Sequence, residues 1–171
     1  EFYWDTSAKA FAERMQKEYK AFWNEKRREK ATVQGLTPEQ VMILDSIVQK
    51  ETYMTDERPT IAGVYLNRLK ERMPLQADPT VVYAIKETTG NYDTIIKRVY
   101  IKDTQIASPY NTYQIQGLPP APIAMPDISS IEAVLSPKEH EYLFFVADTA
   151  RIGYHKFART LQEHNKNRQA Y

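Results

Sequence analysis

The sequence has no cysteine, no long apolar run and almost no net charge. Without cysteine, the protein can form neither a disulfide nor a zinc site with thiolate ligands. The 23 basic and 22 acidic residues nearly cancel and are interspersed, so no basic stripe is available to hold a phosphate backbone, and we expect no nucleic-acid partner. No apolar run approaches the length of a membrane span, and no signal peptide is recognisable.

The residues that are present are typical of one soluble globular domain. Of 171 residues, 42% are apolar and 26% are charged, which suffices for a real core, and the chain has no internal repeat or flexible linker. Twelve tyrosines stand out. Their flat amphipathic rings can fill a core or stack on the faces of sugars, and core packing is the default interpretation.

The clearest element is a helix from Thr37 to Thr52. Thr37 can cap its first turn, Pro38 suits the first helical position, and Gln40 can complete a capping box by reaching back to Thr37. A stripe of apolar residues follows at helical spacing: Val41, Leu44, Ile47 and Val48. The pattern therefore predicts a helix with one face in the core.

Glu51 lies in line with this stripe, four residues after Ile47 and three after Val48. Burial and the negative end of the helix dipole both disfavour an ionised carboxylate, so both would raise the pKa of Glu51 and suit it to act as a general acid near neutral pH. The alternative is that the stripe ends at Val48 and that Glu51 is a solvated residue of the last turn. Periodicity alone favours this alternative.

A resemblance to a known family begins at this helix. The segment SIVQKET is similar to the helix that bears the catalytic Glu in the YceG-like, MltG-type endolytic transglycosylases of bacterial peptidoglycan. Other blocks match in the family's order: YWDTS at 3–7, LQADPTVVYAI at 75–85, SPYNTYQIQGLPPAPIA at 108–124, YLFFVAD at 142–148, then His155, Phe157 and EHN at 163–165. The chain departs from the family at Gln49, where Glu is common, and at Ala121 and Asp127, where Gly is usual.

The resemblance implies an activity and a catalytic residue. We expect non-hydrolytic cleavage of the β-1,4 bond between N-acetylmuramic acid and N-acetylglucosamine, within a strand, leaving a 1,6-anhydro end. Glu51 would first protonate the glycosidic oxygen and then, once ionised, take the proton of the C6 hydroxyl. Neither a metal nor another cofactor is expected.

The resemblance also implies a cellular setting. Such proteins carry an amino-terminal membrane anchor and a small LysM-like region, so we expect this chain to be the catalytic portion of a longer protein. A single-pass anchor would hold it on the periplasmic side of the inner membrane. The expected partners are peptidoglycan glycan strands and peptidoglycan synthases.

Two other functions stay open at this point. A hydrolase could use Glu51 together with Asp78 as two carboxylates, which is the usual arrangement for glycoside hydrolysis. A glycan-binding module without catalysis could grip sugar with its tyrosines, and Glu51 would then only hydrogen-bond the glycan.

The amino-terminal part predicts one long amphipathic helix from Ser7 to about Arg28, capped by Asp5 or Thr6. We expect residues 1–36 to pack against a catalytic core of residues 37–171.

Two further helices are predicted before residue 91. One begins at Pro59 and ends before Pro74, and its Tyr65, Asn67 and Arg68 could line a cleft, although Asn and Arg on a helix are more typical of a surface. The other is capped by Asp78, opened by Pro79 and ends near Gly90.

The residues around this cap are candidate substrate ligands. Capping explains Asp78 fully, yet Asp78 is also the first candidate for a second carboxylate. Gln76 and Thr80, on either side of it, are candidates for hydrogen bonds to substrate.

The sequence from Ser108 to Pro122 predicts an extended segment of polar and aromatic residues that ends in a stiff, polyproline-like stretch. Hydroxyls, amides and aromatic rings suit a sugar chain. With the family resemblance, Tyr110, Asn111, Thr112 and Tyr113 are expected in the cleft. Without it, a surface loop stiffened by proline explains the segment equally well.

The carboxyl-terminal part predicts a helix opened by Asp127 or Ser129 and then a hairpin of 142–146 with 153–157. Thr160 and Glu163 form a capping box for a last helix that ends near Tyr171. The chain as a whole therefore predicts a mostly helical α+β fold, with a lysozyme-like core and a small antiparallel sheet.

Three residues of this part, Asp148, His155 and His164, could be ligands of a metal, but their spacing follows no known pattern, so no metal site is expected. No serine lies in the glycine-flanked elbow of a nucleophilic triad. We expect Asp148, His155 and Asn165 to hold the hairpin and last helix beside the cleft, and we count them among the candidate substrate-binding residues.

Overall fold

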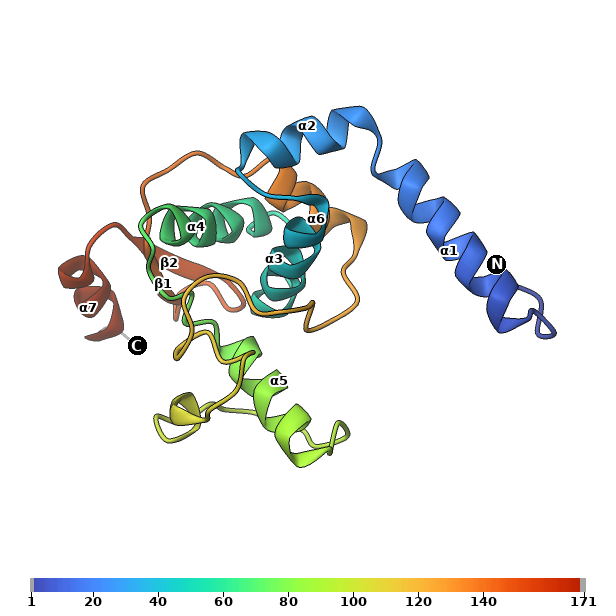
Figure 1. Cartoon of the computed structure of the whole chain (residues 1–171). Helices are drawn as coiled ribbons and strands as arrows, with labels where there is room; N and C mark the ends of the chain where they lie inside the picture. The colour runs from blue at the N-terminus through green and yellow to red at the C-terminus, as the bar shows by residue number, and fades with distance from the viewer. Residues whose placement is uncertain (1, 170–171) are drawn as a thin grey trace.

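The structure, a computed structural model, describes residues 2–169. Its elements, in chain order, are α1 Ala8–Phe22, α2 Glu25–Val33, α3 Pro38–Glu51, α4 Arg58–Lys70, α5 Asp78–Thr89, the 3₁₀ turn η1 Asp103–Gln105, α6 Ile128–Leu135, β1 Phe144–Ala147, β2 His155–Ala158 and α7 Leu161–Gln169. The two strands form an antiparallel pair (Figure 1). The predicted mostly helical α+β fold with a small antiparallel sheet is confirmed.

Helix α3 begins as its sequence predicts. The Thr37 side chain accepts a hydrogen bond from the Gln40 amide at 3.2 Å, and the Gln40 side chain accepts one from the Thr37 amide at 2.9 Å. Pro38 occupies the first helical position. Helix α6 begins at the predicted cap Asp127, whose carboxylate accepts from the Ser130 amide at 2.8 Å. Gly90 ends α5 with a φ of 66°, a left-handed conformation that glycine adopts at low cost.

The single helix predicted from Ser7 to about Arg28 is wrong, because the chain leaves the helical conformation at Trp23. Asn24 then caps a second helix by accepting a hydrogen bond from the Arg27 amide at 3.0 Å. Figure 1 shows α1 projecting away from the rest of the molecule, while α2 lies beside α3 and α6. Helix α1 has no buried residue, whereas Trp23 after it is buried.

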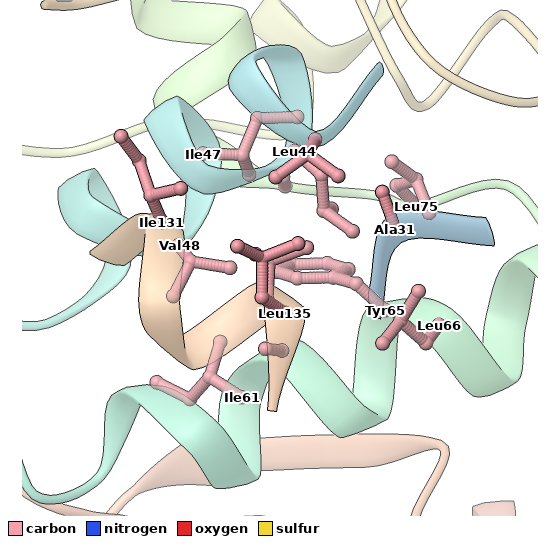
Figure 2. Packing of buried hydrophobic residues seen from close by; sticks show 14 of the residues in the cluster. Ala31, Leu44, Ile47, Val48, Ile61, Tyr65, Leu66, Leu75, Ile131 and Leu135 are labelled. Carbon is pink, nitrogen blue, oxygen red and sulfur yellow. The ribbon is translucent and has the colours of Figure 1, made fainter. Parts of the chain in front are cut away.

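The core forms where α3, α4 and α6 pack together, with α2 at one edge (Figure 2). Its centre contains Leu44, Ile47, Ile61, Tyr65 and Leu135, none of which is more than 2% exposed. Burying a side chain of this size contributes roughly 1.5–3 kcal/mol. Packing against α4 and α6 therefore fixes the position of the end of α3, where Glu51 lies.

The hairpin attaches to the core through α4. Its strands pair Phe144 with Ala158 and Ala147 with His155, which confirms the predicted hairpin with slightly shifted ends. On α4, Asn67 donates to two carbonyls of the chain entering the hairpin, at 2.8 and 3.1 Å. The ring of Phe145 meets that of Tyr65 edge-on at 5.9 Å. The sheet is thereby placed next to the end of α3.

The segment after Ser108 consists of turns, so its predicted extended conformation is wrong. The Ser108 hydroxyl accepts from the Tyr110 amide at 3.2 Å, and the Asn111 side chain accepts from the Tyr113 amide at 3.0 Å. Side chains of this kind capture nearby amides and bend the chain, which overrides the extended tendency of the aromatic residues.

The capping box predicted for α7 forms only in part. The Thr160 hydroxyl accepts from the Glu163 amide at 3.2 Å, but the Glu163 carboxylate returns to the amide of Arg159 rather than to that of Thr160. The predicted end of this helix near Tyr171 lies outside the described residues.

Asp45 on α3 is an unusual core residue. It is completely buried, and neither carboxylate oxygen has a hydrogen-bond partner. Burial, assisted by the negative charge of Asp127, raises the pKa of Asp45 to about 8. The folded state therefore holds a proton on Asp45 that the unfolded chain releases above its ordinary pKa of 3.8.

This difference predicts that the free energy of unfolding falls as pH rises from about 4 to 8, because over that range only the folded state binds the proton. The side chain in Asp45→Asn cannot titrate. The free energy of unfolding of this variant minus that of wild type, measured by urea unfolding, should therefore be more positive at pH 8 than at pH 5. Asp93→Asn, at an exposed site, is the matched control. An equal effect of Asp45→Asn at both pH values would contradict the prediction.

Candidate active site

Glu51 lies where two hollows of the surface meet. The hairpin hollow, of about 480 Å³, is lined by side chains of α4, α5, the hairpin and α7, among them Tyr65, Arg68, His155 and His164. Gln76, just before α5, and Tyr113, in the turn segment after Ser108, also line it. The α5 hollow, of about 1050 Å³, lies between α5, the segment 92–99 and residues 123–125. Glu51 and Asp78 line both hollows. Together the two hollows form one cleft with these carboxylates at its middle.

The Glu51 carboxylate is held at the floor of this cleft. The Tyr65 hydroxyl donates a hydrogen bond to Glu51 Oε1. Burial raises the pKa of Glu51, the Tyr65 hydrogen bond lowers it, the negative charge of Asp78 raises it, and the positive fields of His155 and Arg68 lower it, with a balance of about 7. Glu51 is thus a partly buried cleft residue with a raised pKa, and not the solvated residue of the last turn that periodicity alone favoured.

Tyr65 and Arg68 are the cleft residues that sequence reasoning undervalued. The Tyr65 ring is only 1% exposed and packs in the core, so its hydroxyl reaches Glu51 from a fixed position. Arg68 is 6% exposed and donates to the carbonyls of Leu143 at 2.6 Å and Leu75 at 2.7 Å. The signal was their spacing, since residues three apart on a helix share a face, and Tyr65 belongs to the apolar face.

Asp78 does not cap α5, so that prediction is wrong. The capping position belongs to Ala77, and Asp78 is the first helical residue. Its carboxylate instead accepts a hydrogen bond from the Tyr113 hydroxyl at 2.7 Å. Burial raises the pKa of Tyr113, and this hydrogen bond raises it further. Asp78 and Tyr113 therefore form a pair in the cleft beside Glu51.

Gln76 and Thr80, on either side of Asp78, differ in exposure. Gln76 is exposed in the hairpin hollow with a φ of 50°, a conformation that costs a non-glycine residue of order 1 kcal/mol or more. Thr80 is fully buried below the cleft, where its hydroxyl lies 2.8 Å from that of Thr112. The Thr112 hydroxyl also accepts from the Ala77 amide at 2.9 Å. These two threonines join α5 to the turn segment and do not face a ligand.

Asn111 also has a structural position. It is completely buried, and its side-chain amide donates to the carbonyls of Thr104 at 3.0 Å and Ile106 at 2.8 Å. It therefore does not line the cleft, contrary to what was expected from the segment. Tyr110 packs its ring against Tyr83, with centroids 4.6 Å apart, and Tyr83 lines the α5 hollow.

His155 faces the hairpin hollow from β2. The buried Glu57 accepts hydrogen bonds from the His155 amide and from its ring Nδ1, each at 2.8 Å. This pair orients the ring and leaves Nε2 available to a ligand.

Two other candidates of this region lie outside the cleft. Asp148 accepts from the Ala150 amide at 3.0 Å and lies 3.6 Å from the Lys156 ammonium group, so it stabilises the hairpin turn. Asn165 is exposed on α7 and does not line the hollow. His164 lines the hollow instead, stacked on Phe144 with ring centroids 5.4 Å apart.

Residues 2–169 contain neither a cluster of metal-ligating side chains nor a membrane-spanning helix. No group of three His, Asp or Glu side chains in that range converges as a metal site would require. Across the same range, every helix is too short or too polar to cross a membrane.

The chain is similar in sequence and in structure to known proteins. A sequence model of the YceG-like family matches residues 1–170. The chain belongs to this family. A crystal structure of a yceG-like protein from Listeria monocytogenes superposes with a TM-score of 0.69 at 41% identity, covering 81% of this chain and 43% of that one.

Two curated relatives are named endolytic murein transglycosylase. The one from Bacillus subtilis (strain 168) is 44% identical over 131 residues, which are 77% of this chain and 34% of the relative. The one from Streptococcus pneumoniae serotype 2 (strain D39) is 36% identical over 133 residues, which are 78% of this chain and 24% of the relative. The chain thus spans about a third or less of each relative's length.

The departures from the family pattern have structural uses here. Gln49 accepts a hydrogen bond from the Asp127 amide at 2.8 Å and so ties α3 to the start of α6. Asp127 has a φ of −90°, which needs no glycine, and pairs with the buried Arg58 at 2.7 Å. Partial burial would raise the pKa of Asp127, but the hydrogen bonds from Arg58 and the Ser130 amide lower it to about 2.

The bond from Tyr65 predicts a measurable effect on Glu51. Tyr65→Phe removes a donor that stabilises the ionised carboxylate, so the pKa of Glu51 should rise above about 7. NMR of protein labelled with ¹³C at glutamate carboxyls would measure this without any assay of activity. Tyr142→Phe, at a ring stacked on Phe157 outside the cleft, is the control and should leave the value unchanged. An unaltered Glu51 titration in Tyr65→Phe would sink the idea.

Proposed function

We propose that this chain is the catalytic portion of an endolytic murein transglycosylase. The observation that carries the proposal is a single carboxyl group, Glu51, whose pKa is raised to about 7 at the point where two hollows of one cleft meet. A carboxyl with this pKa is protonated in a large fraction of molecules near neutral pH and can also act ionised. The names of the relatives from Bacillus subtilis and Streptococcus pneumoniae support the same activity.

The proposed reaction uses Glu51 twice. Protonated Glu51 donates to the oxygen of the β-1,4 bond between N-acetylmuramic acid and N-acetylglucosamine, and that oxygen leaves as a hydroxyl as its bond to C1 breaks. Ionised Glu51 then takes the proton of the muramic acid C6 hydroxyl, whose oxygen bonds to C1 and closes a 1,6-anhydro ring. The proton returns to Glu51, so no water is consumed.

The neighbours of Glu51 suit both halves of this cycle. The apolar surroundings favour the protonated acid that begins the reaction, while the Tyr65 hydrogen bond and the fields of His155 and Arg68 stabilise the carboxylate that follows. These opposing effects keep the pKa near the pH at which both forms are accessible. We assign Tyr65 to holding the carboxyl oxygen in place, because its ring is fixed in the core.

The cleft also supports cleavage within a strand. Glu51 has a hollow on each side, so a glycan can extend in both directions from the bond that breaks. We assign Gln76, Tyr113 and His155 to contacts with sugar on the side of the hairpin hollow. Tyr110 would act through Tyr83 on the other side.

A second candidate function is hydrolysis. Asp78 lines both hollows beside Glu51, and in that reaction one carboxylate would activate water or attack the sugar. The hydrogen bond from Tyr113 to Asp78 keeps this carboxylate oriented in the cleft. The reaction products distinguish the two candidates.

On the family resemblance, we further propose a setting for the full-length protein. A single-pass anchor elsewhere in it would hold this domain on the periplasmic side of the inner membrane, beside the peptidoglycan synthases whose strands it cuts.

Replacing Glu51 tests the catalytic role. Glu51→Gln cannot release a proton, so cleavage of purified murein should fall by about 10²- to 10⁴-fold while glycan affinity stays nearly the same. Because the folded pKa of about 7 exceeds the ordinary 4.5, the ionised carboxylate destabilises the fold above pH 7. The melting temperature of Glu51→Gln should therefore rise more at pH 8 than at pH 5. Exposed Glu71→Gln is the control, and a loss of stability with retained cleavage would make Glu51 structural.

The product identifies the reaction. Mass spectrometry of the fragments should show ends that weigh one water less than hydrolysis products, and borohydride should not reduce them. Ends that accept borohydride and take up ¹⁸O from labelled water would instead establish hydrolysis, with Asp78 as the first residue to replace.

A further inference from the structure

The α5 hollow has a charge pattern that an uncharged sugar chain does not require. Four cationic side chains line it: Lys50, Lys86, Lys97 and Arg98. Its acidic lining residues are Glu51 and Asp78, both at the border with the hairpin hollow. Glu87 on α5 is a carboxylate outside this lining, and its field reaches the lining residues Tyr83 and Tyr92. The part of the hollow away from Glu51 is therefore positively charged.

None of these four cations is neutralised by a carboxylate of residues 2–169. Lys50, Lys97 and Arg98 are exposed, and none of them forms an ion pair with a carboxylate of residues 2–169. Lys86 donates to the carbonyl of Tyr92 at 3.0 Å, which leaves its charge uncompensated. By contrast, Arg14 on the outer surface of α1 pairs with Glu18 at 2.6 Å.

Apolar side chains lie among the cations. Val82, Ile96, Val99 and Met125 line the same hollow. Their presence fits a ligand that carries small apolar groups together with carboxylates. Murein offers such a ligand beside its sugar chain, because each muramic acid bears a short peptide with methyl groups and free carboxylates.

We propose that the α5 hollow binds the carboxylate-bearing peptide of murein, so that the enzyme selects strands that still carry their peptides. This inference rests on the proposed function, and it adds a specificity determinant to that function. The bond at Glu51 would be cut next to a muramic acid whose peptide lies along α5. The hairpin hollow thereby takes sugar alone, while the larger α5 hollow takes the sugar chain next to Glu51 and the peptide along its cationic side chains.

The size of the effect follows from the exposure of the cations. Exposed ion pairs are weak, and each cation contributes a few-fold in affinity at most. We therefore expect wild type to cleave peptide-bearing strands roughly 3- to 10-fold more efficiently than peptide-free strands, through a lower KM rather than a higher kcat. The preference should decline in high salt, since the screening length shortens from about 8 Å at physiological ionic strength to about 3 Å at 1 M.

The test compares two substrates and two variants. The substrates are uncross-linked strands, freed of phosphate polymers, before and after an amidase removes their peptides. Lys97→Gln/Arg98→Gln removes two cations of the hollow, and Lys17→Gln/Lys20→Gln makes the same charge change on exposed α1. The first variant should lose most of the preference, because its kcat/KM should fall more on peptide-bearing strands than on peptide-free strands. The second should behave as wild type.

Several outcomes would overturn the inference: equal cleavage of both substrates by wild type, equal loss on both substrates in Lys97→Gln/Arg98→Gln, or the same loss in the α1 variant. Binding of the two substrates to Glu51→Gln gives a readout that needs no turnover, and tighter binding of peptide-bearing strands is expected there. If no cleavage occurs on either substrate, the proposed function fails, and this binding comparison still decides the inference by itself.

Discussion

The hydrogen bond between Tyr65 and Glu51 joins the core of the protein to its cleft. It connects α4 to the last residue of α3, the two helices on which the hairpin, α5 and α6 are assembled. The Tyr65 ring is part of the packed interior, so the position of the acidic group depends on the whole core. A substitution that loosens the packing of α3 against α4 would therefore shift the position of the Glu51 carboxyl group.

Helix α3 carries two buried carboxyl groups whose ionisation lowers the stability of the fold. Two carboxyl groups on this helix, Asp45 and Glu51, have raised pKa values because burial disfavours their ionised forms. Glu51 lies in the cleft, where the proposed acid catalysis would use the raised pKa, whereas Asp45 is fully buried and has no hydrogen-bond partner. Sites of function commonly retain such unfavourable groups, and the surrounding apolar core offsets them.

Local signals in the sequence gave correct elements where a residue acts on its own neighbours. The Thr37 capping box, the left-handed Gly90 and the hairpin strands rich in aromatic residues are all of this kind. The burial of Glu51 could be predicted only with the family resemblance, because periodicity does not show that Tyr65 of α4 covers this side chain. The prediction failed for Asp78 and Asn111, whose partners lie far along the chain or in a turn segment that no periodicity describes. Nor did the amphipathic pattern, whose apolar residues end at Trp23, show that Asn24 caps a second helix.

The split at Asn24 gives α1 a mechanical property. The helix is 15 residues long, so at 1.5 Å per residue its far end lies about 22 Å from the junction. It buries no residue of its own, and its direction is set near Trp23 and by the hydrogen bond from Tyr19 to Glu39. A rotation of about 10° at this junction would sweep the opposite end through roughly 4 Å. A small rotation near the buried Trp23 would therefore produce a large displacement of the amino-terminal end of α1.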